Sequence, residues 1–259
     1  MADALAPGVW WLHGTRGSNV YAVEASDGQI ALVDTGFASN AGPILQELRS
    51  LGIAERLTAI LVTHMHADHT GAVAGLRDAT GARVVAGRAD CERGTDAWYL
   101  RARVGRTHVG RLVLGRVLRR RPRAARVDTL LDGDAEVLPG VRAVPVPGHT
   151  PGSYCFIVER GGVALVGDLV ISHGGRLTRP MRLANDDDEG YLASLASFAA
   201  VAPGKGLPGH GAPVLERFGE QLRGLAAMPR RRTRGWNPAR RFWRVGRFVR
   251  GMLARRGAQ

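Results

Sequence analysis

Apolar residues along the chain form short runs that are separated by glycine-rich turns. Runs rich in valine, isoleucine and leucine predict strands; they lie at residues 9–12, 19–24, 29–33, 58–63, 83–86, 141–146, 154–159 and 163–166. Apolar residues spaced three or four apart predict helices; these cover 39–51, 70–79, 96–120, 189–201 and 213–225. We expect Ser39 or Asn40 to cap the first helix and the acidic run 186–188 to open the fourth. The alternation predicts an α/β fold with one strand-rich region in each half.

The composition changes abruptly after Pro229, where arginine and aromatic residues replace the mixed sequence that precedes them. We therefore expect a main domain over 1–228 and a basic C-terminal extension over 229–259. A chain of 259 residues is long enough for one large core or two modest domains.

The most informative motif follows the strand predicted at 58–63. It reads Thr-His-Met-His-Ala-Asp-His, with His64, His66, Asp68 and His69 inside six residues. A loop at the end of a strand directs several side chains into one space, and imidazole and carboxylate groups are ligands that zinc prefers. These residues are enough to begin two metal sites, so the motif predicts a dinuclear centre.

Three more residues of ligand type lie in glycine-rich turns that follow apolar runs. They are His149, Asp168 and His210. A single histidine is more often a surface or core residue than a ligand. Five of the eight histidines in the chain belong to these two sets, however, and this concentration favours metal binding.

In type and order these motifs resemble the metallo-β-lactamase-fold superfamily over about residues 8–225. The resemblance implies an αββα sandwich with the metal ions at one edge. It also implies that one metal ion is held by His64, His66 and His149.

The same resemblance assigns the remaining residues of the set. It implies that the second metal ion is held by Asp68, His69 and His210, and that Asp168 bridges the two ions. Asp34, at the end of an early predicted strand, is implied to orient the ligands from behind through hydrogen bonds.

The chemistry implied by this centre is hydrolysis. A metal ion lowers the pKa of bound water from about 15.7 toward 7, and two ions about 3.5–4 Å apart hold the resulting hydroxide between them. Asp68 and Asp168 are the candidate catalytic residues, which orient the hydroxide or pass a proton to the leaving group.

True β-lactamases of this superfamily usually carry cysteine or serine in place of the bridging aspartate. Retention of Asp168 makes the chain more similar to the glyoxalase II, lactonase, phosphodiesterase and nuclease branches, although Ile171 stands where lactonases often have tyrosine.

We expect hydrolysis of an ester, thioester or lactone in a small, acyl or lipid-like substrate, with two zinc ions as cofactors. Iron and manganese suit the same ligands. One alternative is cleavage of a phosphodiester, including RNA. Another is an iron-dependent reaction similar to that of sulfur dioxygenases.

The net charge of +13 comes from two arginine-rich segments. Residues 101–126 carry ten arginines and residues 230–259 carry eleven, and neither segment contains an acidic residue. Together they hold +21, which leaves −8 for the rest of the chain. The segment 101–126 lies between the first ligand cluster and His149, so we expect it to form a lid beside the metal centre.

The C-terminal segment 230–256 has the pattern of an amphipathic helix. Its aromatic and aliphatic residues fall on one stripe, and arginines fill much of the rest. This pattern is typical of a helix at an anionic membrane surface, although a terminal helix that packs its apolar face on the body is the favoured explanation; nucleic-acid binding is the least favoured alternative. The chain shows neither a signal peptide nor a membrane span, so we expect a cytoplasmic protein, peripheral at the inner membrane surface if the segment binds lipid.

Overall fold

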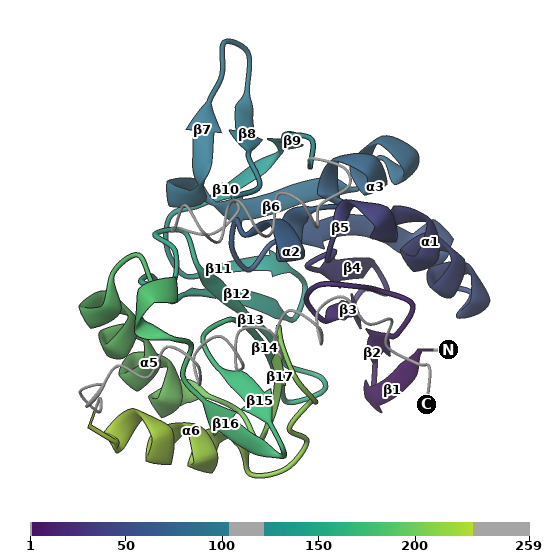
Figure 1. Ribbon diagram of the computed structural model, residues 1–259. Helices are drawn as coiled ribbons and strands as arrows, with labels where there is room; N and C mark the ends of the chain where they lie inside the picture. The colour runs from purple at the N-terminus through teal and green to yellow at the C-terminus, as the bar shows by residue number, and fades with distance from the viewer. Residues whose placement is uncertain (1, 104–121, 230–259) are drawn as a thin grey trace, which may run out of the picture.

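The computed structural model describes residues 2–103 and 122–229, which form four layers (Figure 1). In this part of the chain a seven-stranded sheet packs face to face on a five-stranded sheet. Helices cover the outer face of each sheet. The αββα sandwich expected from the sequence is therefore confirmed.

The first sheet has the order β1-β2-β3-β4-β5-β6-β10. Its strands are β1 (Asp3–Ala6), β2 (Val9–Leu12), β3 (Val20–Glu24), β4 (Ile30–Val33), β5 (Leu57–Leu61), β6 (Arg83–Gly87) and β10 (Thr129–Leu131). Neighbouring strands from β1 to β4 pair antiparallel, whereas the pairs β4–β5, β5–β6 and β6–β10 are parallel. The outer face is covered by α1 (Ala41–Ser50) and α3 (Val73–Thr80).

The second sheet has the order β11-β12-β13-β14-β17. Its strands are β11 (Ala135–Leu138), β12 (Val141–Pro145), β13 (Tyr154–Val158), β14 (Val163–Gly167) and β17 (Lys205–Pro208). Strand β17 runs parallel to β14, while the other neighbours are antiparallel. The outer face is covered by α5 (Asp188–Val201) and α6 (Phe218–Ala227).

Several smaller elements complete the described residues. A three-stranded sheet contains β7 (Cys91–Arg93), β8 (Trp98–Leu100) and β9 (Ala125–Val127), and its β7–β8 hairpin projects from the body in Figure 1. A hairpin joins β15 (Ile171–His173) to β16 (Arg176–Thr178). Single turns of helix lie at α2 (Ala67–Thr70), η1 (Ala38–Asn40), η2 (Ala54–Arg56), η3 (Arg88–Asp90) and η4 (Arg182–Ala184).

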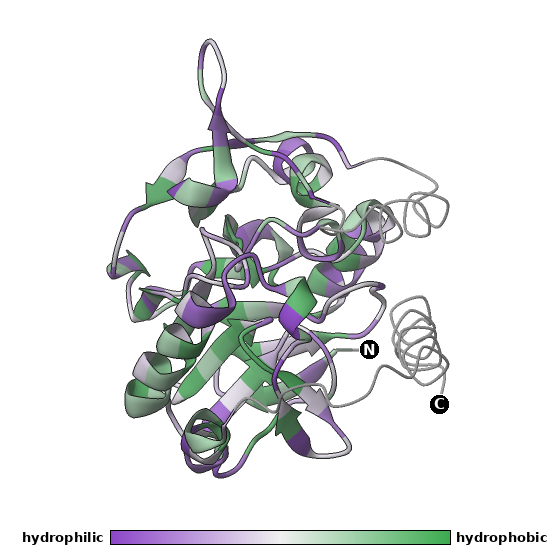
Figure 2. Ribbon diagram, turned by 60° about the vertical axis from the view of Figure 1, so that its left-hand side comes forward, coloured by the Kyte–Doolittle hydropathy of each residue, from purple (hydrophilic) through white to green (hydrophobic). Residues whose placement is uncertain are grey.

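The space between the two sheets is filled by apolar side chains from both. Val33 and Leu61 of the first sheet and Phe156 of the second belong to one buried cluster, and Figure 2 shows hydrophobic colour along the central strands. Burial of apolar surface is the main stabilising contribution to such a core. The sandwich therefore provides a rigid base for the loops at its edges.

Three helix predictions need correction. Residues 98–100 form strand β8 because they pair with β7 and β9, so the helix expected over 96–120 is wrong there. The helix expected from residue 213 begins only at Phe218, since Val214 instead exchanges two backbone hydrogen bonds with Gly206 at the edge of the second sheet. The helix expected over 70–79 is divided into α2 and α3.

Neither residue expected to cap the first helix does so. The Asn40 side chain accepts a hydrogen bond from the Arg16 backbone and donates to the carbonyls of Arg16 and Thr35. It therefore ties the loop before β3 to the end of β4 and leaves α1 without a side-chain cap. By contrast, Asp187 accepts from the backbone of Glu189 and Gly190 and caps α5, as the acidic run predicted.

Several predictions concern residues outside the described part of the chain. They include the lid expected over 101–126, most of which is not described, the membrane or nucleic-acid contacts expected of 230–256, and the separate C-terminal extension expected over 229–259. These remain predictions. Among the residues that the structure describes, no helix has the length and apolar character needed to span a membrane.

Replacing Phe156 by alanine is expected to lower the free energy of unfolding by about 3–5 kcal/mol, because the change leaves a cavity between the sheets. Ile157 faces the helical layer, is half-buried and serves as the matched control. We expect a clearly smaller loss for Ile157→Ala. Urea unfolding of both variants measures the difference, and equal losses would contradict the assignment of the inter-sheet core.

Candidate metal centre

All seven predicted ligand residues lie together at one edge of the sandwich. The first four belong to the loop after β5 and to α2, and the others follow β12, β14 and β17. Strand β4 is parallel to β5, and β14 is parallel to β17, so the carboxyl ends of each pair meet at one edge. This topology explains how residues from 64 to 210 reach a common site.

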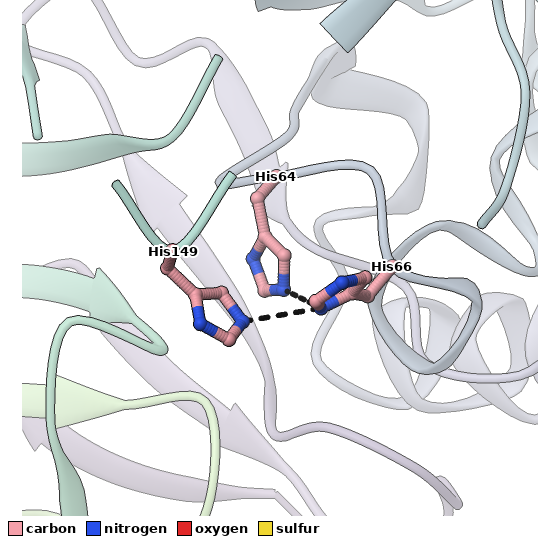
Figure 3. Close-up of side chains that lie close together, drawn as sticks. All are labelled: His64, His66 and His149. Carbon is pink, nitrogen blue, oxygen red and sulfur yellow. Dashed lines mark hydrogen bonds between the residues drawn. The ribbon is translucent and has the colours of Figure 1, made fainter. Parts of the chain in front are cut away.

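Three histidines form the first group, which Figure 3 shows in close-up. His66 Nδ1 lies 3.0 Å from His64 Nε2 and 3.1 Å from His149 Nε2. His64 and His149 are buried, and His66 is half-buried. Three ring nitrogens from two different loops therefore converge on one small space.

Hydrogen bonds on the far side of two of these rings determine which nitrogen carries a proton. The Thr63 hydroxyl donates its hydrogen to Asp34, so at 3.1 Å its oxygen accepts from His64 Nδ1. The amide of Asn185 donates to Asp188, which turns its oxygen toward His149 Nδ1 at 3.0 Å. In the neutral form of each ring, Nε2 is then the acceptor nitrogen, and it points at the centre.

When all three rings are neutral, the three converging nitrogens carry at most one proton between them, and that proton is on His66 Nδ1. Burial and the nearby imidazole of His149 lower the pKa of His66 to about 3. Burial, followed by the charge of neighbouring imidazoles, also holds the pKa of His64 well below its ordinary value. With neutral rings, a proton on His66 Nδ1 can be donated to only one of the two facing Nε2 lone pairs, whereas a metal ion accepts all three nitrogens, so this arrangement fits a metal ion.

Asp68, His69 and His210 form the second group. His210 Nε2 lies 3.3 Å from Asp68 Oδ2 and 3.4 Å from His69 Nε2. Although burial raises it, the contacts with His210 and His69 hold the pKa of Asp68 well below its usual range. The aspartate therefore stays ionised and offers a carboxylate to a cation.

Asp168 lies between the two groups. Its Oδ1 is 3.4 Å from His69 Nε2 and 3.5 Å from His210 Nε2, whereas its Oδ2 is 3.6 Å from His149 Nε2. Although burial raises it, His210 and His69 hold the pKa of Asp168 well below its usual range. One carboxylate thus directs one oxygen toward each group.

Asp34 supports the centre from behind, with hydrogen bonds to two segments. Its Oδ1 accepts from the Thr63 backbone at 2.9 Å, and its Oδ2 accepts from the Thr63 hydroxyl and from His69 Nδ1, both at 2.7 Å. The backbone of Asp34 is left-handed at φ 58°, which is uncommon for a residue other than glycine. Although burial lowers it, Asp34 and then Asp168 hold the pKa of His69 well above its ordinary value.

Some residues at the site were not identified from the sequence. Asn185 binds His149, yet the sequence around it indicated only the start of a helix. Asn19 donates from its amide to the carbonyls of Pro208 and Gly211, on either side of His210. Both contacts join segments that are far apart in the chain, and a local pattern carries no signal for them.

Arg103, in the described start of the arginine-rich segment, lies beside the histidine loop. Its backbone donates to the Met65 carbonyl at 2.9 Å and accepts from Ala67 at 3.0 Å. Its guanidinium pairs with Asp186 at 2.7 Å, and the Asp186 backbone donates to the His149 carbonyl. Arg103 therefore links the two loops that supply the first group.

A family model described as the metallo-beta-lactamase superfamily matches residues 13–210. Lactamase-like protein vrtG of Penicillium aethiopicum is 31% identical over 214 residues, which cover 80% of this chain and 55% of that protein. A hydroxyacylglutathione hydrolase of Cereibacter sphaeroides is 34% identical over 155 residues, which cover 60% of this chain and 48% of that protein. The chain spans about half the length of these curated relatives.

Solved structures show the same fold. Metallo-beta-lactamase family protein TTHA1429 from Thermus thermophilus aligns with a TM-score of 0.61 at 21% identity, over 86% of this chain and 78% of that one. TTHA1623, solved in a di-iron-bound form, aligns with a TM-score of 0.59 at 25% identity, over 81% of this chain and 92% of that one. The family match across more than half of the sequence, together with the four-layer fold, shows that the chain belongs to the metallo-beta-lactamase superfamily.

Proposed function

We propose that the chain is a hydrolase with a dinuclear metal centre that cleaves an ester, thioester or lactone. The observation that carries this proposal is the position of Asp168, whose two carboxylate oxygens face two adjoining groups of ligand-type residues. A carboxylate shared in this way suits a pair of cations better than a single one.

The ligand sets follow from the two groups. The first ion would be held by His64, His66 and His149, and the second by Asp68, His69 and His210, with Asp168 as a ligand to both. Within each three-residue group of candidate ligands, the donor atoms lie within 4.8 Å of one another. Nitrogen and carboxylate oxygen are ligands that zinc takes readily, so we propose zinc in both positions.

Two metal ions would supply an activated water near neutral pH and would polarise the substrate oxygen. The protein supplies orientation and proton transfer. Both oxygens of Asp168 face ligand groups, whereas Asp68 directs only Oδ2 toward His210. We therefore assign two steps to Asp68 Oδ1, which would accept the proton released by the attacking water and then pass it to the leaving group, and we assign orientation of the water to Asp168.

The bond class rests on the relatives and on Asp168. One relative is named hydroxyacylglutathione hydrolase, and this name favours an acyl bond in a small molecule. Asp168 occupies the position where true β-lactamases of the superfamily usually have cysteine or serine, which disfavours a β-lactam. The substrate that we propose is a small acyl compound. Compounds with a lipid-like acyl chain contain the same class of bond and are included in this proposal.

A hydrolysis panel tests the bond class directly. Zinc-loaded protein is offered aryl esters, thioesters, lactones, a β-lactam and a bis-aryl phosphodiester. We expect turnover of one class of carbonyl compound, with a loss of at least about 100-fold in His66→Ala because one ion loses a ligand. Turnover of the phosphodiester alone would contradict the proposed bond class and would support a nuclease-like reaction.

Metal analysis tests the dinuclear centre independently of any substrate. The wild-type protein is expected to bind two metal ions per chain after dialysis, and His66→Ala is expected to retain one. His173→Ala is the matched control, because His173 is exposed and lies outside both groups. Elemental analysis gives the count and distinguishes zinc from the iron present in TTHA1623. Equal counts in wild type and His66→Ala would exclude the proposed first site.

A further inference from the structure

Asp90 is a buried carboxylate outside the set of ligand-type residues. It ends the η3 turn that follows β6, and only 6% of its surface is exposed. Such a carboxylate is costly to bury unless hydrogen bonds compensate it. Burial raises the pKa of Asp90, against the lowering effect of its hydrogen bonds.

The hydrogen bonds of Asp90 come from two loops. Its Oδ2 accepts from the Met65 backbone at 2.9 Å and from the Thr150 hydroxyl at 2.7 Å, and its Oδ1 accepts from the Gly152 backbone at 2.7 Å. Met65 lies between His64 and His66, and Thr150 directly follows His149. One side chain therefore contacts the immediate neighbours of all three histidines in the first group.

These two loops belong to different halves of the sandwich. The loop of Met65 follows β5 of the first sheet, and the loop of Thr150 and Gly152 connects β12 to β13 of the second. The chain packs tightly here, since a Cβ atom on Gly87 would lie 2.2 Å from the Gly152 carbonyl oxygen. Asp90 thus lies where the spacing between the loops is determined.

We propose that Asp90 is a positioning residue that sets the distance between the His64–His66 loop and His149, and thereby the affinity of the three-histidine group for its metal ion. This inference rests on the proposed function, because it assumes that the group holds a metal ion. The residue does not touch the ion; it acts through the backbone of Met65 and the turn 150–152. Partners that orient ligands in this way typically change metal affinity by about 10–100-fold when they are altered.

Asp90→Asn tests the inference with little change in shape. An amide offers one acceptor oxygen, and its NH2 group faces a hydrogen-bond donor wherever it is turned. We expect the affinity for the first metal ion to fall by about 10–100-fold in competition with a chelator. We also expect the visible absorption of the cobalt-loaded protein to change, because the geometry of the three nitrogens changes.

Asp128→Asn is the matched control. Asp128 also accepts a backbone hydrogen bond, from Val84 of β6 at 2.8 Å, and it pairs with Arg77, and neither partner is a candidate ligand. Both variants are expected to lower the melting temperature of the metal-free protein. Only Asp90→Asn is expected to weaken metal binding and alter the cobalt spectrum.

A second pair of variants covers the case in which Asp90→Asn does not fold. Thr150→Val removes one hydrogen bond to Asp90 and is expected to weaken metal binding. Thr150→Ser keeps the hydroxyl and is expected to bind metal as the wild type does. Wild-type affinity and spectrum in Asp90→Asn, or in Thr150→Val, would overturn this inference alone. Wild-type protein that binds no metal ion would contradict the proposed function, and this inference with it.

Discussion

The burial of closely spaced imidazoles and carboxylates at one edge of the sandwich places the strongest demand on the surrounding structure. Ring nitrogens lie 3.0 and 3.1 Å apart in the first group, and His210 of the second lies 3.3 Å from Asp68 and 3.5 Å from Asp168. Such an arrangement needs a stiff framework around it and suits cations within it. The framework consists of the two sheets, whose packed interior fixes the strand ends from which the loops leave.

Hydrogen bonds and close backbone contacts transmit this stiffness to the ligand-type residues. The rings of His64, His69 and His149 are each held from behind by a fixed partner. The turn that carries His210 lies so close to the His69 ring that a Cβ atom on Gly209 would be 2.5 Å from His69 Cε1. Only glycine fits there, which explains why the last histidine follows a glycine. The centre is therefore built as much by its surroundings as by its candidate ligands.

The sequence predicted the αββα sandwich and the residues that meet at its edge, because the histidine-rich motif and the later glycine-rich turns are local signals. It did not predict Asn185, Asn19 or the hydrogen bonds of Asp90, because those contacts join segments that only the tertiary structure brings together. The late start of α6 has the same origin, since sheet pairing of Val214 overrides helical periodicity. Local patterns thus identify the chemistry, whereas long-range contacts determine its geometry.

The dinuclear centre is tested directly by anomalous X-ray scattering at the zinc edge from crystals of the zinc-loaded protein. Two peaks about 3.5–4 Å apart are expected. One peak should lie beside His64, His66 and His149, the other beside Asp68, His69 and His210, and Asp168 should contact both. A single peak, or two peaks of which Asp168 contacts only one, would contradict a shared dinuclear centre.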